Sequence, residues 1–290
     1  MKNDSWKNYY SCFSLLCISV FFLVQSNTFA QAVDDDEELN KGVSVSPSHL
    51  HFNVDLGNTN TKTIKVSNYS AKLQKFQVVY QDFDITEDGY SSFLEAGTSD
   101  YSLSELIQIS PTFVEIEAGS FAEITLSLTV PANPEANRAA WGVVMIEQME
   151  EKKVLDPGNT SGSTVAFGIT PTYAFGVWLY QNPPNVENMH VDITNFIFEK
   201  KVENNLLFLK VKNEGDGISF CNAYVEITNL STGEQNILGG KRYTILPGYR
   251  RTFIFDLTWE LTKGSYSAVG VLDYNSDEEL VAAELEFKVD

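Results

Sequence analysis

Cysteine is scarce in this chain of 290 residues, where only Cys12, Cys17 and Cys221 occur. The first two lie in an N-terminal segment that we expect to be removed, so Cys221 would remain alone and no internal disulfide would form. Exported domains often depend on disulfides, so this protein must instead be held together by its apolar core. Free cysteine is among the most buried residue types, and we expect Cys221 to be a small buried apolar residue.

Basic residues are also few, with 20 Lys and Arg against 39 Asp and Glu, for a net charge of −19. A surface of this charge repels phosphate backbones and anionic lipid headgroups. The composition therefore argues against nucleic acid as a partner and against peripheral binding to membranes. Part of the acid is concentrated in Asp34–Glu38, where like charges repel and predict a solvated, disordered leader.

Long apolar runs are absent apart from Cys12–Val24, which is too short to span a bilayer. Two lysines precede this run, and Thr28-Phe29-Ala30 follows it with small residues at the positions of a cleavage site. This pattern predicts a signal peptide over 1–30 and an acidic leader over 31–41. We expect an exported protein, periplasmic or on the cell surface, without stable membrane insertion.

Sustained helical periodicity is missing, and a period of two takes its place. Apolar and polar residues alternate most clearly over Phe121–Val130, where Leu126 is expected to be buried, and over Val281–Val289. Many short strands separated by turn signals predict an all-β fold of two tandem immunoglobulin-like β-sandwich domains. Pro183-Pro184 cannot continue a central strand, so we place the domains at 42–182 and 186–290. No residue-level repeat relates the two halves.

Motifs of enzymes are absent as well. The chain has no Gly-x-Ser-x-Gly elbow, phosphate loop or dinucleotide fingerprint, so we predict neither an enzyme nor a cofactor. His49 and His51 would share one strand face, but two histidines alone do not complete a zinc site. The spacing from Asp84 to Glu95 matches a calcium loop, whereas a hairpin with an Asp-Gly turn at Asp88-Gly89 is the simpler interpretation.

Several segments resemble the periplasmic pilus-chaperone (PapD-like) superfamily. Val43–Pro47 looks like its opening strand, Val66-Ser67-Asn68 like the end of a later strand, and Trp178–Tyr180 like the end of its donor strand. The resemblance implies a chaperone role in fimbrial biogenesis and a protein partner, such as a surface-fibre subunit, bound by β-strand addition. The expected partner-binding residues are the alternate apolar side chains Val165, Phe167 and Ile169.

Two departures from the family pattern limit this expectation. The resemblance implies that the C-terminal carboxylate of a subunit is clamped by an arginine on the first strand and a lysine on the donor strand. His49 and Phe175 stand at these positions, so we expect no carboxylate clamp. Pro171 interrupts the donor run and confines this point to a sheet edge or a bulge. The run also remains open to a simpler interpretation, as an internal strand without a partner.

A second resemblance competes with the first. Asp82–Tyr90, Ser102–Val130 and Asn137–Ile146 also look like parts of the surface proteins that pair with WxL proteins on Gram-positive walls. This resemblance implies a structural or adhesive protein of the cell surface that binds wall glycan or polysaccharide through exposed aromatic residues. The aromatic residues Trp141, Trp178 and Trp259 are more simply explained as sandwich core, because aromatic side chains dominate such cores.

Overall fold

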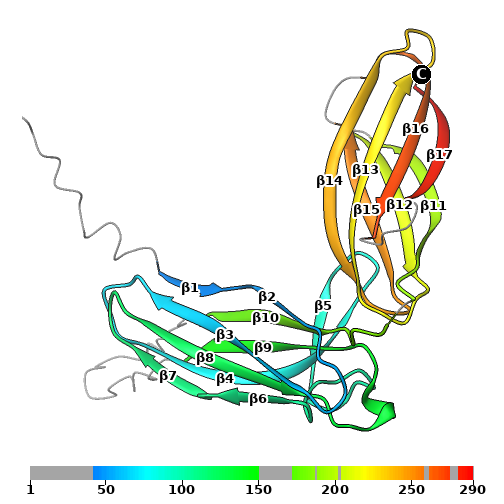
Figure 1. Ribbon diagram of the computed structural model, residues 1–290. Coiled ribbons are helices and arrows are strands. Elements are labelled where there is room, and N and C mark those ends of the chain that lie inside the picture. The colour runs from blue at the N-terminus through cyan, green and yellow to red at the C-terminus, as the bar shows by residue number, and fades with distance from the viewer. Residues whose placement is uncertain are drawn as a thin grey trace, which may run out of the picture. The chain divides into compact units, whose positions relative to one another are not determined.

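The computed structural model describes residues 42–149, 172–186, 188–201, 204–257, 261–274 and 280–289. Within them the chain forms seventeen β-strands and one short 3-10 helix, Pro134–Ala136. The strands make four sheets, two from β1–β10 and two from β11–β17 (Figure 1), which confirms the predicted all-β fold of tandem sandwiches. The predicted signal peptide and acidic leader lie outside the described residues.

The first sandwich pairs two largely antiparallel sheets. One has the strand order β1 (Val43–Ser46), β3 (Thr59–Asn68), β8 (Phe121–Thr129) and β6 (Ile107–Ser110). The other has the order β2 (His49–Phe52), β10 (Ala174–Gln181), β9 (Ala140–Gln148), β4 (Gln74–Ile85) and β5 (Ser91–Leu94), with β7 (Phe113–Ile116) also paired to β4.

Edge strands of the first sandwich pass from one sheet to the other. β1 is followed by Pro47 and then by β2 in the opposite sheet, and β6 is followed by Pro111 and then by β7. Both Ser-Pro peptide bonds are cis. Each of these strands contributes only four residues to its sheet, so the edges that they form are short. Short edge strands are one of the ways in which natural sheets avoid unwanted pairing.

The core of the first sandwich follows the period-two pattern. Ile124, Leu126 and Leu128 on β8 have no exposed surface, whereas Thr125 between them is exposed. The prediction that Leu126 is buried is therefore confirmed. These side chains belong to one apolar cluster with residues of both sheets, among them Phe76 and Val177.

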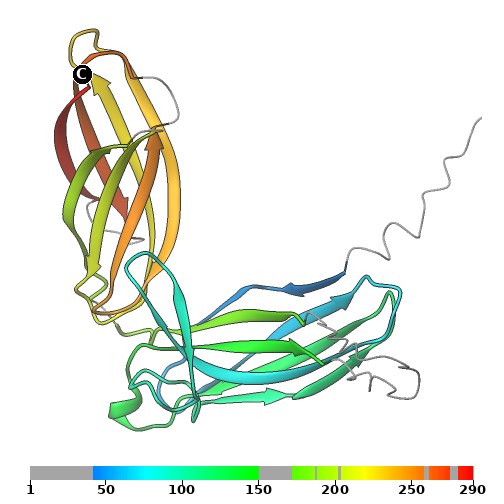
Figure 2. The same ribbon diagram turned by 180° about the vertical axis from the view of Figure 1, so that it is seen from behind.

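The second sandwich, yellow-green to red in Figures 1 and 2, is built from β11–β17. One sheet has the order β11 (Val191–Lys200), β12 (Asn205–Asn213) and β15 (Arg250–Leu257). The other has the order β14 (Gln235–Ile245), β13 (Ser219–Asn229), β16 (Gly264–Asp273) and β17 (Val281–Val289). β10 ends at Gln181 and β11 begins at Val191, and the domain boundaries at 182 and 186 stay a prediction.

Cys221 lies on β13 inside the core of the second sandwich, with only 1% of its surface exposed. Burial, with a smaller contribution from Asp273, raises the pKa of its thiol to about 12. The thiolate is the reactive form of cysteine, so this side chain acts as an apolar core residue, as predicted.

A buried asparagine closes one corner of the first sandwich. Asn68, the last residue of β3, has no exposed surface. Its amide group donates to the carbonyl oxygens of Lys72 (2.7 Å) and Ile116 (2.8 Å). Its carbonyl oxygen accepts from the N–H (3.0 Å) and the hydroxyl (2.6 Å) of Ser70. One side chain therefore ties a turn to a strand of the opposite sheet.

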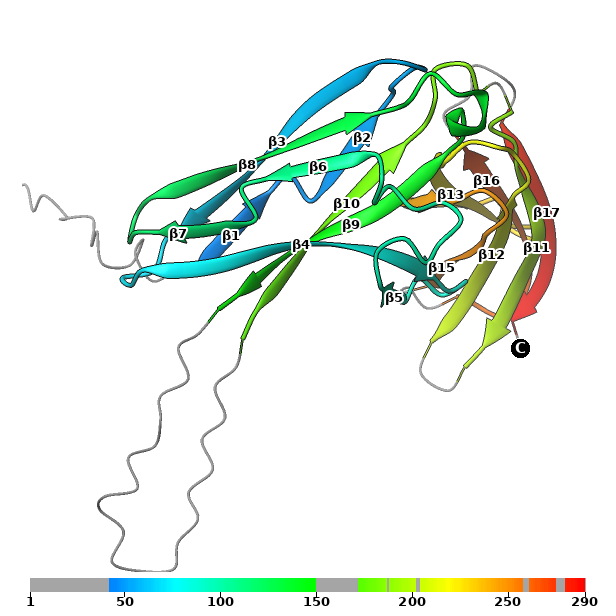
Figure 3. The same cartoon turned by 90° about the horizontal axis from the view of Figure 1, so that it is seen from below.

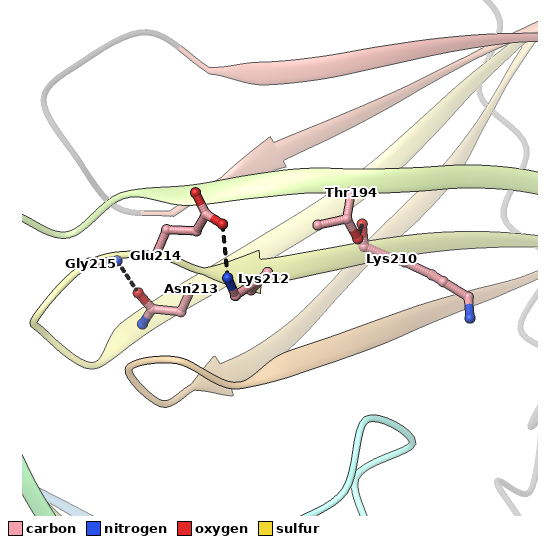
Figure 4. A network of polar contacts seen from close by, with 6 residues as sticks. All are labelled: Thr194, Lys210, Lys212, Asn213, Glu214 and Gly215. Carbon is pink, nitrogen blue, oxygen red and sulfur yellow. Dashed lines mark hydrogen bonds and ion pairs between the residues drawn. The ribbon is translucent and has the colours of Figure 1, made fainter.

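The same corner recurs in the second sandwich. Asn213, the last residue of β12, is equally buried. Its amide group donates to the carbonyl oxygens of Gly217 and Ile245, each at 2.8 Å. Its carbonyl oxygen accepts from the N–H of Gly215 at 2.9 Å, a bond drawn in Figure 4.

The two corners correspond residue by residue. In each, the asparagine amide donates to the carbonyl oxygen of the residue four positions later. It also donates to the carbonyl oxygen of an isoleucine, and a glycine with positive φ follows that isoleucine three positions later. That glycine, Gly119 or Gly248, donates its N–H to the backbone carbonyl of the asparagine. A Val-x-Asn segment and an Ile-x-x-Gly segment are therefore repeated in the two halves, a relation that the sequence alone did not show.

Candidate functional site

Val165, Phe167 and Ile169, the predicted partner-binding residues, lie outside the described residues, as does Pro171. The described part of the predicted donor strand is β10, which begins at Ala174. The candidate site is therefore built from β10 and the strands beside it.

β10 is paired unequally on its two sides. On one side, β9 runs antiparallel to it along its whole length, from Ala174 to Gln181. On the other side, β2 runs parallel to it but covers only Trp178–Gln181 (Figure 3). Within the described residues, Ala174–Val177 therefore has a neighbouring strand on one side only, which leaves the segment as a sheet edge.

The backbone direction along this edge follows from the pairing further on. The N–H of Trp178 donates to the carbonyl of Ser48, the residue before β2, at 3.0 Å. Peptide groups of successive residues in a strand point to opposite sides. The N–H groups of Ala174 and Gly176 therefore point to the open side, while those of Phe175 and Val177 point to β9. Unpaired groups of this kind are a template for another strand.

Apolar side chains accompany the open backbone. Val177 is fully buried in the core cluster, and Phe175 is half-buried against it. Phe175 and Val177 therefore point into the sandwich, whereas Ala174 and Gly176 lie on the outer face. An added strand at this edge would cover the remaining exposed surface of Phe175.

The two positions of the family's carboxylate clamp are not arranged as a clamp. His49 lies on the outer face of its sheet, where its ring stacks on Trp178 with centroids 5.4 Å apart, and Phe175 faces the core. Burial lowers the pKa of His49 below its ordinary value, so the ring is neutral at neutral pH. Neither side chain offers a positive charge to a carboxylate.

His51 continues this ladder of rings by stacking on Tyr180, with centroids 5.5 Å apart. Burial, then the neighbouring His49 and then Lys62, lower the pKa of His51. Among the residues that the structure describes, no group of three or more His, Cys, Asp or Glu side chains is placed to hold a metal ion. The same part of the chain contains no helix with the length and apolarity needed to cross a bilayer.

The segment with calcium-loop spacing is a hairpin between β4 and β5. The N–H of Gly89 donates to the carbonyl of Thr86 at 2.9 Å, and the N–H of Thr86 donates to the carbonyl of Tyr90 at 3.0 Å. Gly89 has a φ of 91°, a conformation that favours glycine. The Asp-Gly turn is thus the interpretation that the structure supports.

Aromatic residues were a candidate glycan-binding face, and Trp141 does not fit that role. Only 1% of its surface is exposed, and the ring of Tyr101 stacks on it with centroids 4.2 Å apart. Its indole N–H points to the carbonyl of Phe83 at 3.4 Å. Trp178 is partly covered by His49, and Trp259 lies outside the described residues.

A buried carboxylate in the first sandwich was missed in the sequence. Asp82 on β4 has no exposed surface. One of its oxygens accepts from the hydroxyls of Tyr80 (2.8 Å) and Ser102 (2.6 Å), and the other from the N–H groups of Thr98 (2.9 Å) and Ser99 (3.0 Å). These bonds fasten the segment between β5 and β6 onto the sheet. The only signal for it is an acidic residue within a strand rich in apolar residues.

Gly142 on β9 makes room for this network. A Cβ atom at Gly142 would collide with the hydroxyl of Tyr80, which also accepts from the N–H of Leu103 at 2.8 Å. Burial raises the pKa of Tyr80 well above its ordinary value, so its hydroxyl keeps its proton and donates to Asp82.

Comparison with known proteins gives matches of fold only. No family model and no curated protein matches the chain. Among solved structures, the class 5 fimbriae chaperone CfaA covers 86% of this chain and 100% of its own length, at 14% identity and a TM-score of 0.42. The E. coli chaperone DraB covers 84% and 98%, at 13% identity and a TM-score of 0.41.

A third structure contains a chaperone–tip adhesin complex of CFA/I fimbriae biogenesis. It covers 84% of this chain and 98% of its own, at 13% identity and a TM-score of 0.44. These solved structures are fimbrial chaperones, the group that the sequence resembles. At these identities the similarity concerns the fold alone, and function has to be argued from the site.

Proposed function

We propose that this chain is an exported, non-enzymatic protein-binding module of the bacterial envelope, periplasmic or at the cell surface. Its partner is another envelope protein, such as a surface-fibre subunit, and binding occurs by strand addition at β10. The observation that supports this function is the edge over Ala174–Val177, where backbone groups without a partner among the described residues accompany a half-buried apolar side chain.

In this mechanism the incoming strand bonds to the outward backbone groups of Ala174 and Gly176. Each such hydrogen bond contributes about 0.5–1.5 kcal/mol net, so apolar contacts must add to them. Phe175 supplies one contact at the described edge. We propose that Val165, Phe167 and Ile169 supply further contacts from the residues before it, because alternate side chains give specificity in strand addition.

Ala174→Pro should weaken partner binding by about two- to tenfold, which corresponds to the loss of one such hydrogen bond, and should leave the first sandwich folded. Proline removes the N–H of residue 174, which points to the open side, and leaves the hydrogen bonds between β10 and β9 intact. Proline is also tolerated at sheet edges. Ala174→Val is the matched control, because it keeps the N–H and should bind as the parent does. Capture of partners from envelope extract, quantified by mass spectrometry, checks the binding, and circular dichroism checks the fold.

Hydrogen exchange tests the same edge in the protein alone. The amides of Ala174 and Gly176 should exchange faster than those of Phe175 and Val177, and should become protected when the partner is bound. A folded Ala174→Pro variant that retains all its partners would contradict strand addition at this edge.

Binding should not depend on a free C-terminal carboxylate of the partner. His49 is neutral at neutral pH and Phe175 is apolar, so neither position attracts a carboxylate. Amidation of the C-terminus of a bound partner peptide should therefore change its Kd less than threefold, measured by fluorescence anisotropy. A loss of tenfold or more, about 1.4 kcal/mol, would reveal a carboxylate site elsewhere.

A further inference from the structure

A cavity of about 370 Å³ lies wholly within the first sandwich. It opens between the segment that precedes β6 and the segment that joins β8 to β9. Its polar lining consists of Ser99, Ser102, Ser104, Glu105, Glu135 and Arg138. Its volume is within the range of small-molecule sites, and it lies apart from the edge of β10.

The serine residues that line this cavity are held in place by the buried carboxylate of Asp82. The hydroxyl of Ser102 donates to the buried carboxylate of Asp82 at 2.6 Å, and the hydroxyl of Ser104 lies 3.0 Å from that of Ser102. The N–H of Ser99 also donates to Asp82. Binding groups that are fixed by such supporting bonds lose little freedom when a ligand arrives.

The segment that carries the lining serines is tied to β9 as well. Ser102 forms a bridge with Trp141, the second residue of β9, and the N–H of Trp141 donates to the carbonyl of Tyr101 at 2.9 Å. Arg138, three residues before Trp141, lies over the ring of Tyr101 at 6.0 Å. Tyr101 thus lies between the serine segment and the arginine, and its own backbone is bonded to β9.

The charges of the lining restrict the class of ligand. Glu105 and Glu135 would repel a phosphate or another multiply charged anion, and Arg138 offsets part of their attraction for a metal ion or an amine. Among the described residues, Arg138 forms no ion pair with either glutamate. All three charged groups thus remain available to a ligand.

We propose that this cavity binds a neutral saccharide. Sugars carry hydroxyls that both donate and accept, which matches a lining of carboxylates, a guanidinium and serine hydroxyls. Planar charged groups can form two parallel hydrogen bonds at once, and adjacent hydroxyls of a sugar ring offer that geometry. Glycan recognition would then rest on this polar cavity rather than on exposed tryptophans.

Titration of the ¹⁵N-labelled mature chain with maltose, cellobiose and N,N′-diacetylchitobiose tests the proposal. At least one of them should shift the amide resonances of Ser99–Ser104 and of Glu135–Arg138, with a Kd of about 1 mM, equivalent to about −4 kcal/mol. Arg138→Ala should raise that Kd at least tenfold. Arg138→Lys should also weaken binding, because lysine lacks the planar fork.

Arg250→Ala is the control, since it removes an exposed arginine of the second sandwich and should leave the Kd unchanged. Because Arg138 is exposed, its variants should retain the amide spectrum of the folded chain. Absence of shifts with all three sugars up to about 10 mM, well above that Kd, would overturn the proposal. Shifts that persist unchanged in Arg138→Ala, or that sodium acetate reproduces, would do so too. Ala174→Pro should not alter sugar binding, which separates this site from the strand edge.

Discussion

Asn68→Ala should lower the free energy of unfolding by at least about 3 kcal/mol. The side chain makes four hydrogen bonds in a site without solvent access. A buried polar group that loses its partner costs about 1–3 kcal/mol. Alanine would remove the hydrogen bonds that the Asn68 side chain makes to the carbonyl of Ile116 and to the N–H of Ser70. Urea denaturation followed by circular dichroism measures the effect.

Asn60→Ala on the same strand is the matched control for Asn68→Ala. Asn60 is exposed, so its substitution should change stability by less than about 0.5 kcal/mol. Asn213→Ala should destabilise the second sandwich to a similar degree, because its corner repeats the bonds of Asn68. Equal effects of Asn60→Ala and Asn68→Ala would contradict the role assigned to the buried amide.

Leu126→Ala should cost about 2–5 kcal/mol, the range for truncation of a buried leucine. Leu126 lies in the middle of β8 and has no exposed surface, so alanine would leave a cavity in the first core. Thr125→Ala, on the exposed face of the same strand, should have little effect by comparison. The denaturation midpoint of Leu126→Ala should therefore lie well below that of Thr125→Ala. Similar midpoints would contradict the assignment of the buried and exposed faces of β8.

Both proposed binding sites lie in the first sandwich, but they depend on different features. Strand addition needs the backbone of Ala174 and Gly176, where β2 does not cover β10. Saccharide binding needs Arg138 and the serines that Asp82 holds. One variant at each site, Ala174→Pro and Arg138→Ala, should therefore weaken binding at that site and leave the other site unchanged.

Strand-level features follow from the sequence because they are local. Alternation with a period of two places every second side chain on one face, and this alone identified Leu126 as buried. The same holds for the Asp88-Gly89 turn, since a glycine with positive φ is a local requirement. The run before Tyr180 was likewise identified as a strand, and its described part, β10, is one. The partner-binding role of Val165, Phe167 and Ile169 stays a prediction.

Features that join distant segments were decided only by the tertiary structure. Ile116 lies 48 residues from Asn68 in the chain, and no periodicity links a carbonyl to an amide at that distance. The burial of Asp82 depends on a segment that folds back over β4 and β9, and the open edge of β10 depends on where β2 begins. Local patterns determine which face of a strand is apolar. Which strands meet, and which polar groups are thereby buried or left open, is set by long-range packing of the whole sandwich.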